Sequence, residues 1–255
     1  MKRLELIGIE GIAEVSAGDS VGALICEACS RQNIKVVDED VVVVAHKIVS
    51  KAEGQMVSLN EIHASDRAIE LARELDKEPA LVEVILRESR GIVKVGGRAL
   101  IVETHHGFIC ANAGVDQSNV GLNQVALLPK DPDGSAREIR REIHQRTGKT
   151  PAVIISDSFG RPWRVGTVDV AIGIAGLKPI KDERGMKDRH GYQLKAAVAA
   201  IADEIAAAAE LAMGKRDGVP AVIVRGCDIE REIEKEKGSV RELLRPEAED
   251  LFRHF

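Results

Sequence analysis

The apolar residues of this chain follow two different spacings. Short runs rich in valine and isoleucine predict buried strands, and these lie at residues 4–9, 41–44, 153–155 and 221–224. Apolar residues that recur every three or four positions predict helices, at residues 20–32, 65–76, 78–89, 135–146, 192–214 and 239–255. The four consecutive valines of 41–44 are typical of a strand buried on both faces. We therefore expect a globular protein that mixes helices and strands.

Three further strands are predicted close together, at residues 92–95, 99–103 and 108–110, with turns between them. Consecutive short strands indicate an antiparallel meander and count against the repeated βαβ units of a doubly wound sheet. The sequence also has neither an internal repeat nor a low-complexity linker. We therefore expect residues 1–255 to form a single domain of mixed α/β class with mixed and antiparallel sheets.

The common nucleotide-binding motifs are missing from the sequence. Gly148, Lys149 and Thr150 resemble the end of a Walker loop, but that motif would need a glycine in place of Ile143. The three residues also follow a predicted helix, which a capping box at Ser135 opens, instead of preceding one. No G-x-G-x-x-G pattern occurs. A nucleotide would therefore be bound by a fold that is neither Rossmann nor P-loop.

The amino-acid composition and charge of the chain disfavour several classes of protein function. A net charge of −5 and an aromatic content of 2% disfavour a sequence-independent nucleic-acid binder, which needs a basic surface and stacking platforms. No apolar run is long enough to span a membrane or to act as an export signal, so a cytoplasmic protein is expected. Cys26 and Cys29 lie within a predicted helix without a second pair, which favours buried helix residues over a metal site.

The chemically richest stretch is 152–177. Its apolar strand ends in Ser156, Asp157 and Ser158, and a predicted loop at 159–166 follows with two of the six aromatic residues of the chain. Carboxylate and hydroxyl oxygens at a strand end suit a hard divalent cation and its phosphate ligand. The same residues could instead form an ordinary Asx turn.

Two other segments add to this pattern. The loop at 111–121 carries Asp116 and Asn119 among glycines, and it too follows an apolar strand, which makes a shared site more plausible. Lys47 and Lys51 follow the four valines, where they could meet phosphate oxygens or lie in solvent. A charged stretch at 178–191 is expected to be mobile or to act as a lid.

Nearly the whole chain resembles the coenzyme F420-0:γ-glutamyl ligase family. The resemblance rests on the turn Gly8-Ile9-Glu10-Gly11 and on segments 41–51, 107–119, 155–166, 173–176, 213–215 and 222–226. It implies a two-lobed mixed α/β fold and an intertwined homodimer. Some relatives carry a further nitroreductase-like domain, and this chain is expected to lack it.

The resemblance also implies an activity. Members join L-glutamate through a γ-linkage to the deazaflavin precursor F420-0, and the same reaction is expected on F420-1. GTP would activate the precursor's carboxylate as an acyl phosphate, leaving GDP and phosphate. A metal-dependent nucleotide phosphohydrolase and a non-catalytic GTP-binding regulator are the alternatives.

Site residues follow from the same resemblance. Asp116, Asp157 and Ser158 would ligate Mn²⁺ or Mg²⁺, two ions for each site, with K⁺ as a further candidate ion. The nucleotide would contact Lys51, Asn119 and the turn formed by Gly8, Ile9, Glu10 and Gly11.

Two arginines are added from their charge and position alone. Arg161 and Arg164 are predicted to receive the acidic groups of the deazaflavin substrate. The alternative is that they form salt bridges on the surface or between subunits.

Overall fold

A five-stranded mixed sheet forms the centre of the computed structural model, which describes residues 3–230 and 238–252. The strand order is β1 (Glu5–Gly8), β12 (Ala221–Arg225), β2 (Val41–Ala45), β8 (Ala152–Arg161) and β9 (Arg164–Ala175). Only β2 and β8 run parallel, and the other neighbours in this sheet are antiparallel. All four strands predicted from apolar runs are present here.

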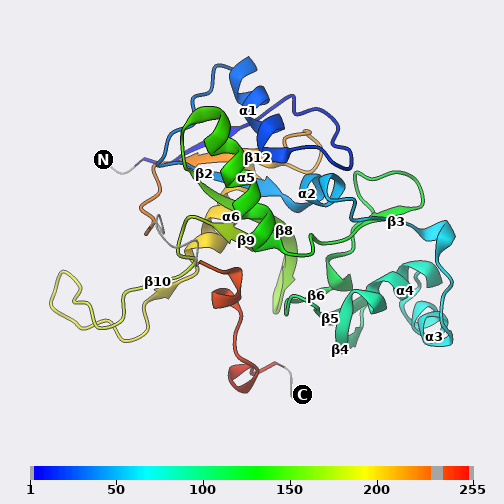
Figure 1. Cartoon of the computed structure of the whole chain (residues 1–255). Helices are drawn as coiled ribbons and strands as arrows, with labels where there is room; N and C mark the ends of the chain where they lie inside the picture. The colour runs from blue at the N-terminus through cyan, green and yellow to red at the C-terminus, as the bar shows by residue number, and fades with distance from the viewer. Residues whose placement is uncertain (1–2, 231–237, 253–255) are drawn as a thin grey trace.

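Helices cover this sheet on both sides. Helix α5 (Pro132–Thr147) packs against β8 and β9 in front, α1 (Val21–Arg31) packs on α5, and α6 (Ile201–Met213) crosses behind (Figure 1). The four valines of β2 and residues 152–155 of β8 have no exposed surface. A strand covered on both faces can be apolar at every position, which explains why these runs do not alternate.

The parallel register of β2 and β8 brings two strand ends together. Ala45 pairs with Ser156, and helix α2 (His46–Ala52) begins at the residue after Ala45. The polar end of β8 therefore lies beside the first turn of α2. This edge of the sheet is where the candidate site forms.

A second apolar cluster, with buried members between Leu59 and Leu127, is separate from the core around the central sheet. It contains β3 (Met56–Ser58), the 3-10 turn η1 (Leu59–Glu61), α3 (Asp66–Leu75), α4 (Pro79–Arg87), β4 (Ser89–Gly96), β5 (Ala99–Thr104), β6 (Ile109–Ala111), the 3-10 turn η2 (Asn112–Gly114) and β7 (Gln124–Ala126). Strands β4, β5 and β6 form the predicted antiparallel meander, and β3 pairs with β7. The mixed α/β prediction with mixed and antiparallel sheets is thus confirmed.

Four local predictions were wrong. Strand pairing continues through most of the predicted loop at 159–166, because β8 and β9 form a hairpin that reaches Arg161 and Arg164. Helix α5 begins at Pro132 with Asp131 as its N-cap, and Ser135 lies inside it. Aspartate before proline is a strong helix start, and it precedes the capping box.

The other two corrections concern the last part of the chain. Residues 192–200 precede α6 and belong to an extended arm, in which β10 (Lys181–Asp182) pairs with β11 (Val198–Ala199) and which projects from the body (Figure 1). The predicted terminal helix at 239–255 is replaced, over its described residues, by the 3-10 turns η3 (Val240–Leu243) and η4 (Glu247–Glu249). Pro246 lies between them and cannot continue a helix.

None of the helices in the described ranges combines the length and apolar character needed to cross a membrane.

Candidate active site

A cavity of about 460 Å³ opens at the carboxyl end of β2, beside residues 156–158 in the middle of β8. Its wall comes from five parts of the chain: residues 12–15 after β1, the first turns of α2, the end of β8 with its neighbour on β9, the loop after β6, and residues 210–220 at the end of α6. Both positive and negative side chains line it. The two chemically rich stretches of the sequence therefore meet in one cavity.

Helix α2 contributes two lysines to the cavity. Lys47 Nζ lies 2.9 Å from Asp116 Oδ2 and 2.5 Å from Ser118 Oγ, which ties the loop after β6 to the helix. Lys51 Nζ lies 2.5 Å from Glu14 Oε1, in the segment that follows β1. Both ammonium groups are held by carboxylates at the cavity surface, where an anionic ligand could share them.

The loop after β6 reaches the cavity with two predicted residues. Hydrogen bonds from Lys47 and Ser118 lower the pKa of Asp116 and outweigh the opposing effect of burial. Asp116 therefore carries a negative charge at neutral pH. Asn119 donates through Nδ2 to the carbonyl oxygen of Lys215 at 3.4 Å, which joins this loop to the end of α6.

The end of β8 presents Asp157 and Ser158 to the same cavity. A bulge between Ile155 and Ser156 interrupts the regular alternation of β8 against β9, and Ser156, Asp157 and Ser158 all line the wall. Ser158 N donates to Asp157 Oδ1 at 2.7 Å. This contact fixes one carboxylate oxygen of Asp157.

His46, the first residue of α2, lies beside Asp157. Its side chain is buried, and Nε2 lies 3.3 Å from Asp157 Oδ1 without the geometry of a hydrogen bond. Nδ1 lies 3.4 Å from Ser50 Oγ, one turn further along α2. A buried ring nitrogen that lacks a hydrogen-bond partner in the described structure and lines a cavity is suited to contact a ligand.

Three acids of the cavity were missed by sequence reasoning: Glu14, which pairs with Lys51, and the two acids Asp169 and Glu210. Asp169 of β9 is buried, and Glu210 of α6 has a pKa raised by burial and, to a smaller extent, by the charge of Asp169. The sequence does contain a signal for Asp169, because this residue is the single acid within the mostly apolar run of β9. Glu210 had none, since an acid on an alanine-rich helix is ordinary.

The oxygen donors of this cavity suit a hard cation such as Mg²⁺ or Mn²⁺, which prefers carboxylate, hydroxyl and water oxygens. Within residues 3–230 and 238–252, no three His, Cys, Asp or Glu side chains are grouped closely enough to hold a metal ion by themselves. The residues present therefore fit a cation that takes part of its coordination from water and from ligand phosphates, as Mg²⁺ usually does.

The other predicted residues lie outside the cavity wall. Gly8 ends β1, and Ile9 is buried with its N–H donating to the carbonyl of Ala221 at 2.9 Å. Glu10 and Gly11 are exposed, and the wall begins at the next residue. Their predicted contact with a nucleotide remains a prediction.

The two predicted arginines lie at the tip of the β8–β9 hairpin. Arg161 and Arg164 are exposed there and do not line the cavity. A substrate long enough to extend from the cavity along the hairpin could still reach them, and their roles also remain predictions.

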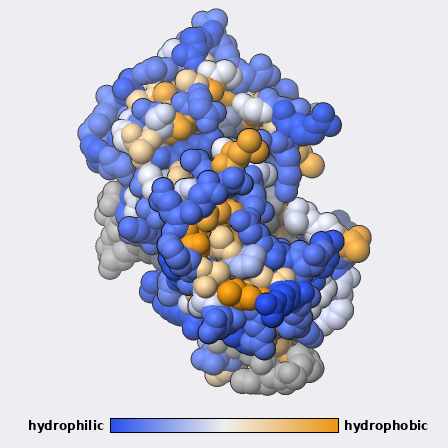
Figure 2. All heavy atoms as spheres, turned by 90° about the vertical axis from the view of Figure 1, so that its right-hand side faces the viewer, coloured by the Kyte–Doolittle hydropathy of each residue, from blue (hydrophilic) through white to orange (hydrophobic). Residues whose placement is uncertain are grey.

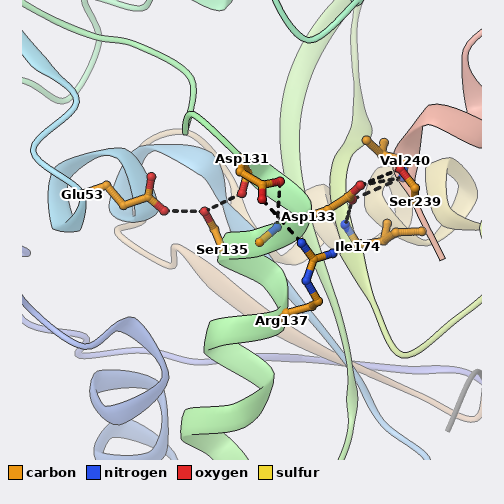
Figure 3. Close-up of polar contacts among 9 residues, drawn as sticks. Glu53, Asp131, Asp133, Ser135, Arg137, Ile174, Ser239 and Val240 are labelled. Atoms are coloured by element: carbon orange, nitrogen blue, oxygen red, sulfur yellow. Dashed lines mark hydrogen bonds and ion pairs between the residues drawn. The ribbon is translucent and has the colours of Figure 1, made fainter. Parts of the chain in front are cut away.

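The first turn of α5 holds the elements around the site in place (Figure 3). Ser135 Oγ donates to Glu53, directly after α2, and lies 3.0 Å from the carbonyl oxygen of Asp131. Asp133 Oδ1 accepts from Ile174 N of β9 at 2.8 Å, and Oδ2 accepts from Ser239 Oγ at 2.7 Å. Helix α2, strand β9 and the segment at 239–244 are therefore connected through one helix start.

Comparison with known proteins gives a consistent result. The family model described as F420-0:Gamma-glutamyl ligase matches residues 10–226. The chain is 49% identical to the coenzyme F420:L-glutamate ligase of Methanothermobacter thermautotrophicus, over 98% of this chain and 99% of the relative. It is 43% identical to the enzyme of the same name from Methanocaldococcus jannaschii, over 99% and 98%, and 44% identical to that of Methanopyrus kandleri, over 98% and 97%.

Proposed function

This chain belongs to the F420-0:gamma-glutamyl ligase family, and on that premise we propose that it uses GTP to join L-glutamate, through a γ-linkage, to F420-0 and then to F420-1. The observation that carries the proposal is the arrangement around one cavity of Asp116, Asp157 and Ser158 with Lys47 and Lys51. Phosphoryl transfer depends mainly on positioning and on charge stabilisation, and this set of side chains supplies both.

Binding of the nucleotide follows from the charges of the cavity. Lys47 and Lys51 would meet phosphate oxygens, exchanging their present carboxylate partners for a more highly charged anion. Asn119, fixed against the end of α6, would hold the nucleotide from the opposite wall. Asp116, Asp157 and Ser158 would hold Mn²⁺ or Mg²⁺, which would supply positive charge to stabilise the negative charge that develops during phosphoryl transfer.

The proposed reaction has two transfers. A carboxylate oxygen of F420-0 attacks the γ-phosphorus of GTP, forming an acyl phosphate while GDP leaves. The amine of L-glutamate then attacks the acyl carbon, the new amide bond forms, and phosphate leaves together with a proton from the amine. The lysines act in both steps, because each leaving group is an anion that they stabilise.

The arginines of the hairpin and the oligomeric state complete the proposal. Arg161 and Arg164 would bind the acidic groups of the deazaflavin where this substrate extends out of the cavity along the hairpin.

A homodimer is supported by apolar surface near these arginines. Trp163 and Val165 are more than four-fifths exposed, and Trp163 contacts Phe252 with ring centroids 4.9 Å apart. Apolar groups are also visible within the largely hydrophilic face of Figure 2. Light scattering after gel filtration should give twice the chain mass, and a monomer would contradict this part.

Mass spectrometry of the deazaflavin tests the central proposal. The purified protein is incubated with F420-0, L-glutamate, GTP and Mn²⁺, and GDP is quantified in parallel. Glutamyl adducts matched by equal GDP are expected, and their mass counts the glutamates added. GDP without adducts would indicate the phosphohydrolase instead, and neither product would indicate a binding protein. Omission of K⁺ in a parallel reaction tests the monovalent ion.

A further inference from the structure

Asp169 is a buried acid in the cavity wall that has no role in the reaction as proposed. It lies on β9 directly opposite Ser158 of β8, and it is only 5% exposed. In an antiparallel pair, a residue shares its face with the residue opposite and with the diagonal neighbour two positions away. Asp169 therefore faces both Ser158 and Ser156.

Both serine hydroxyls donate to this one carboxylate. Ser158 Oγ lies 2.6 Å from Asp169 Oδ1, and Ser156 Oγ lies 2.9 Å from Oδ2. A carboxylate can only accept, and a hydroxyl has only one proton to donate. Once that proton points to Asp169, the oxygen of Ser158 has only lone pairs left for the cavity.

We propose that Asp169 is a positioning residue, which orients the Ser158 hydroxyl so that its oxygen faces a divalent cation in the cavity. The inference rests on the proposed function, because it takes Ser158 as a cation ligand. Without the acceptor, the Ser158 hydroxyl could turn its proton toward the cavity and repel the ion. A hydrogen bond to a carboxylate also makes the hydroxyl oxygen more electron-rich, as partners of ligating groups do in metal sites generally.

The charge of Asp169 acts within the cavity as well. After burial, it is the next contribution to the raised pKa of Glu210, which lines the same cavity from α6. Ser156 is almost fully buried, and its hydrogen bond fixes the second carboxylate oxygen of Asp169. The pair of serines thus keeps the carboxylate of Asp169 in one orientation.

The substitution Asp169→Asn tests this arrangement with little change in shape. The amide nitrogen must donate, so only one of the two serines keeps its acceptor, and Asp169→Ala removes the acceptor from both. The dissociation constant of Mn²⁺ is measured by calorimetry on the full chain in the presence of GDP. We expect it to rise about 10-fold to 100-fold, the usual cost of losing a partner of a ligating group. An unchanged constant in both Asp169→Asn and Asp169→Ala, with Mn²⁺ binding to the wild-type chain, would overturn the inference and leave the proposed function intact.

Asp203→Asn is the matched control. Asp203 also contacts β9, where its Oδ1 accepts from Ala171 N at 2.9 Å, but it does not line the cavity. The same loss of charge beside the same strand should leave Mn²⁺ binding unchanged. Thermal midpoints of both variants are measured alongside. If the control weakens Mn²⁺ binding as much as Asp169→Asn does, the effect comes from the strand and the inference fails.

A double variant shows whether Asp169 acts through Ser158. Ser158→Ala alone should weaken Mn²⁺ binding, and adding Asp169→Asn should then weaken it little further. Fully additive losses would overturn the positioning role. If Asp169→Asn does not fold, the smaller and neutral Asp169→Ser replaces it, and its Mn²⁺ dissociation constant is compared with that of the wild-type chain in the same way. If the wild-type chain binds no Mn²⁺, the proposed cation site fails together with this inference.

Discussion

Lys47 Nζ lies 2.9 Å from Asp116 Oδ2, and this ion pair joins the first turn of α2 to the loop that follows β6. The side chains of Lys47 and Asp116 are 22% and 34% exposed, and both line the same cavity. The pair brings a residue that follows β2 beside one that lies far away in the sequence. It also holds an ammonium group where nucleotide phosphates are expected.

Replacement of Lys47 by glutamine should therefore weaken nucleotide binding. We expect the KM for GTP to rise about tenfold, since a charge-assisted hydrogen bond is lost and tenfold corresponds to about 1.4 kcal/mol. Lys94→Gln, at an exposed position of β4, is the control and should behave as the wild-type chain. Steady-state kinetics with GTP varied measures both. An unchanged KM in Lys47→Gln would remove this lysine from the phosphate site.

Asp157→Ala should abolish ligation without unfolding the protein. The Asp157 side chain is 12% exposed, lines the cavity and accepts from Ser158 N, and it belongs to neither apolar cluster. We expect turnover to fall by about a thousandfold, because the loss of a charged group in a phosphoryl-transfer site is worth several kcal/mol. Asp66→Ala, on the exposed start of α3, is the control. Normal turnover in Asp157→Ala would exclude this residue as a cation ligand.

Arg161→Ala should affect the deazaflavin and leave the nucleotide unaffected. Arg161 lies at the hairpin tip, outside the cavity that holds the proposed nucleotide site. The KM for F420-0 is expected to rise about tenfold, with the GTP dissociation constant unchanged. Arg98→Ala, on an exposed turn distant in sequence, serves for comparison. Equal effects of Arg161→Ala on both ligands would contradict a substrate role and indicate a change in the hairpin itself.

Gly173→Ala should destabilise the fold. A Cβ at this position of β9 would lie 2.4 Å from the carbonyl oxygen of Pro132, at the start of α5. Backbone cannot move aside easily, so we expect a loss of about 1 to 3 kcal/mol in the free energy of unfolding. At Gly160 of β8 a Cβ would meet nothing within 4 Å, so Gly160→Ala should cost nothing. Urea unfolding of the two variants separates close packing from a general effect of the substitution.

Glu83 should make stability depend on pH. Its carboxylate accepts from Ser65 Oγ at 2.6 Å and from Ser65 N at 3.0 Å, and with the Arg87 contact these bonds lower its pKa to about 2, against a small opposing effect of burial. A depressed pKa stabilises the fold above the unfolded value of 4.5, and this contribution is lost as pH falls from 4.5 toward 2.

Glu83→Gln should therefore cost about 1 kcal/mol at pH 7, a value kept low because the carboxylate is close to solvent. The difference from the wild-type chain should shrink as the pH of the unfolding experiment is lowered below 4.5. Glu70→Gln removes an exposed pair with Arg67 on α3 and should show no such dependence. A difference that stays constant from pH 7 to pH 3 would contradict the assigned hydrogen bonds.

Local sequence determined most of the elements of the fold. The valine run of β2 and residues 153–155 of β8 are apolar at every position, and only a strand covered on both faces tolerates this. Helices α3 and α4 follow from their apolar spacing within a few residues. The sequence also indicated Asp116, Asp157 and Ser158 as candidate site residues, because polar side chains in loops after apolar strands are frequent ligand-binding positions. All three line one cavity.

Only the tertiary structure decided which residues meet. Strand pairing extended β8 and β9 through a stretch that resembles a loop, because main-chain hydrogen bonds between strands leave no signature in either strand alone. The same pairing set Asp169 against Ser156 and Ser158, and the parallel register of β2 and β8 set His46 beside Asp157. Such contacts depend on register and on chain path over long separations, whereas residue spacing encodes only the local conformation.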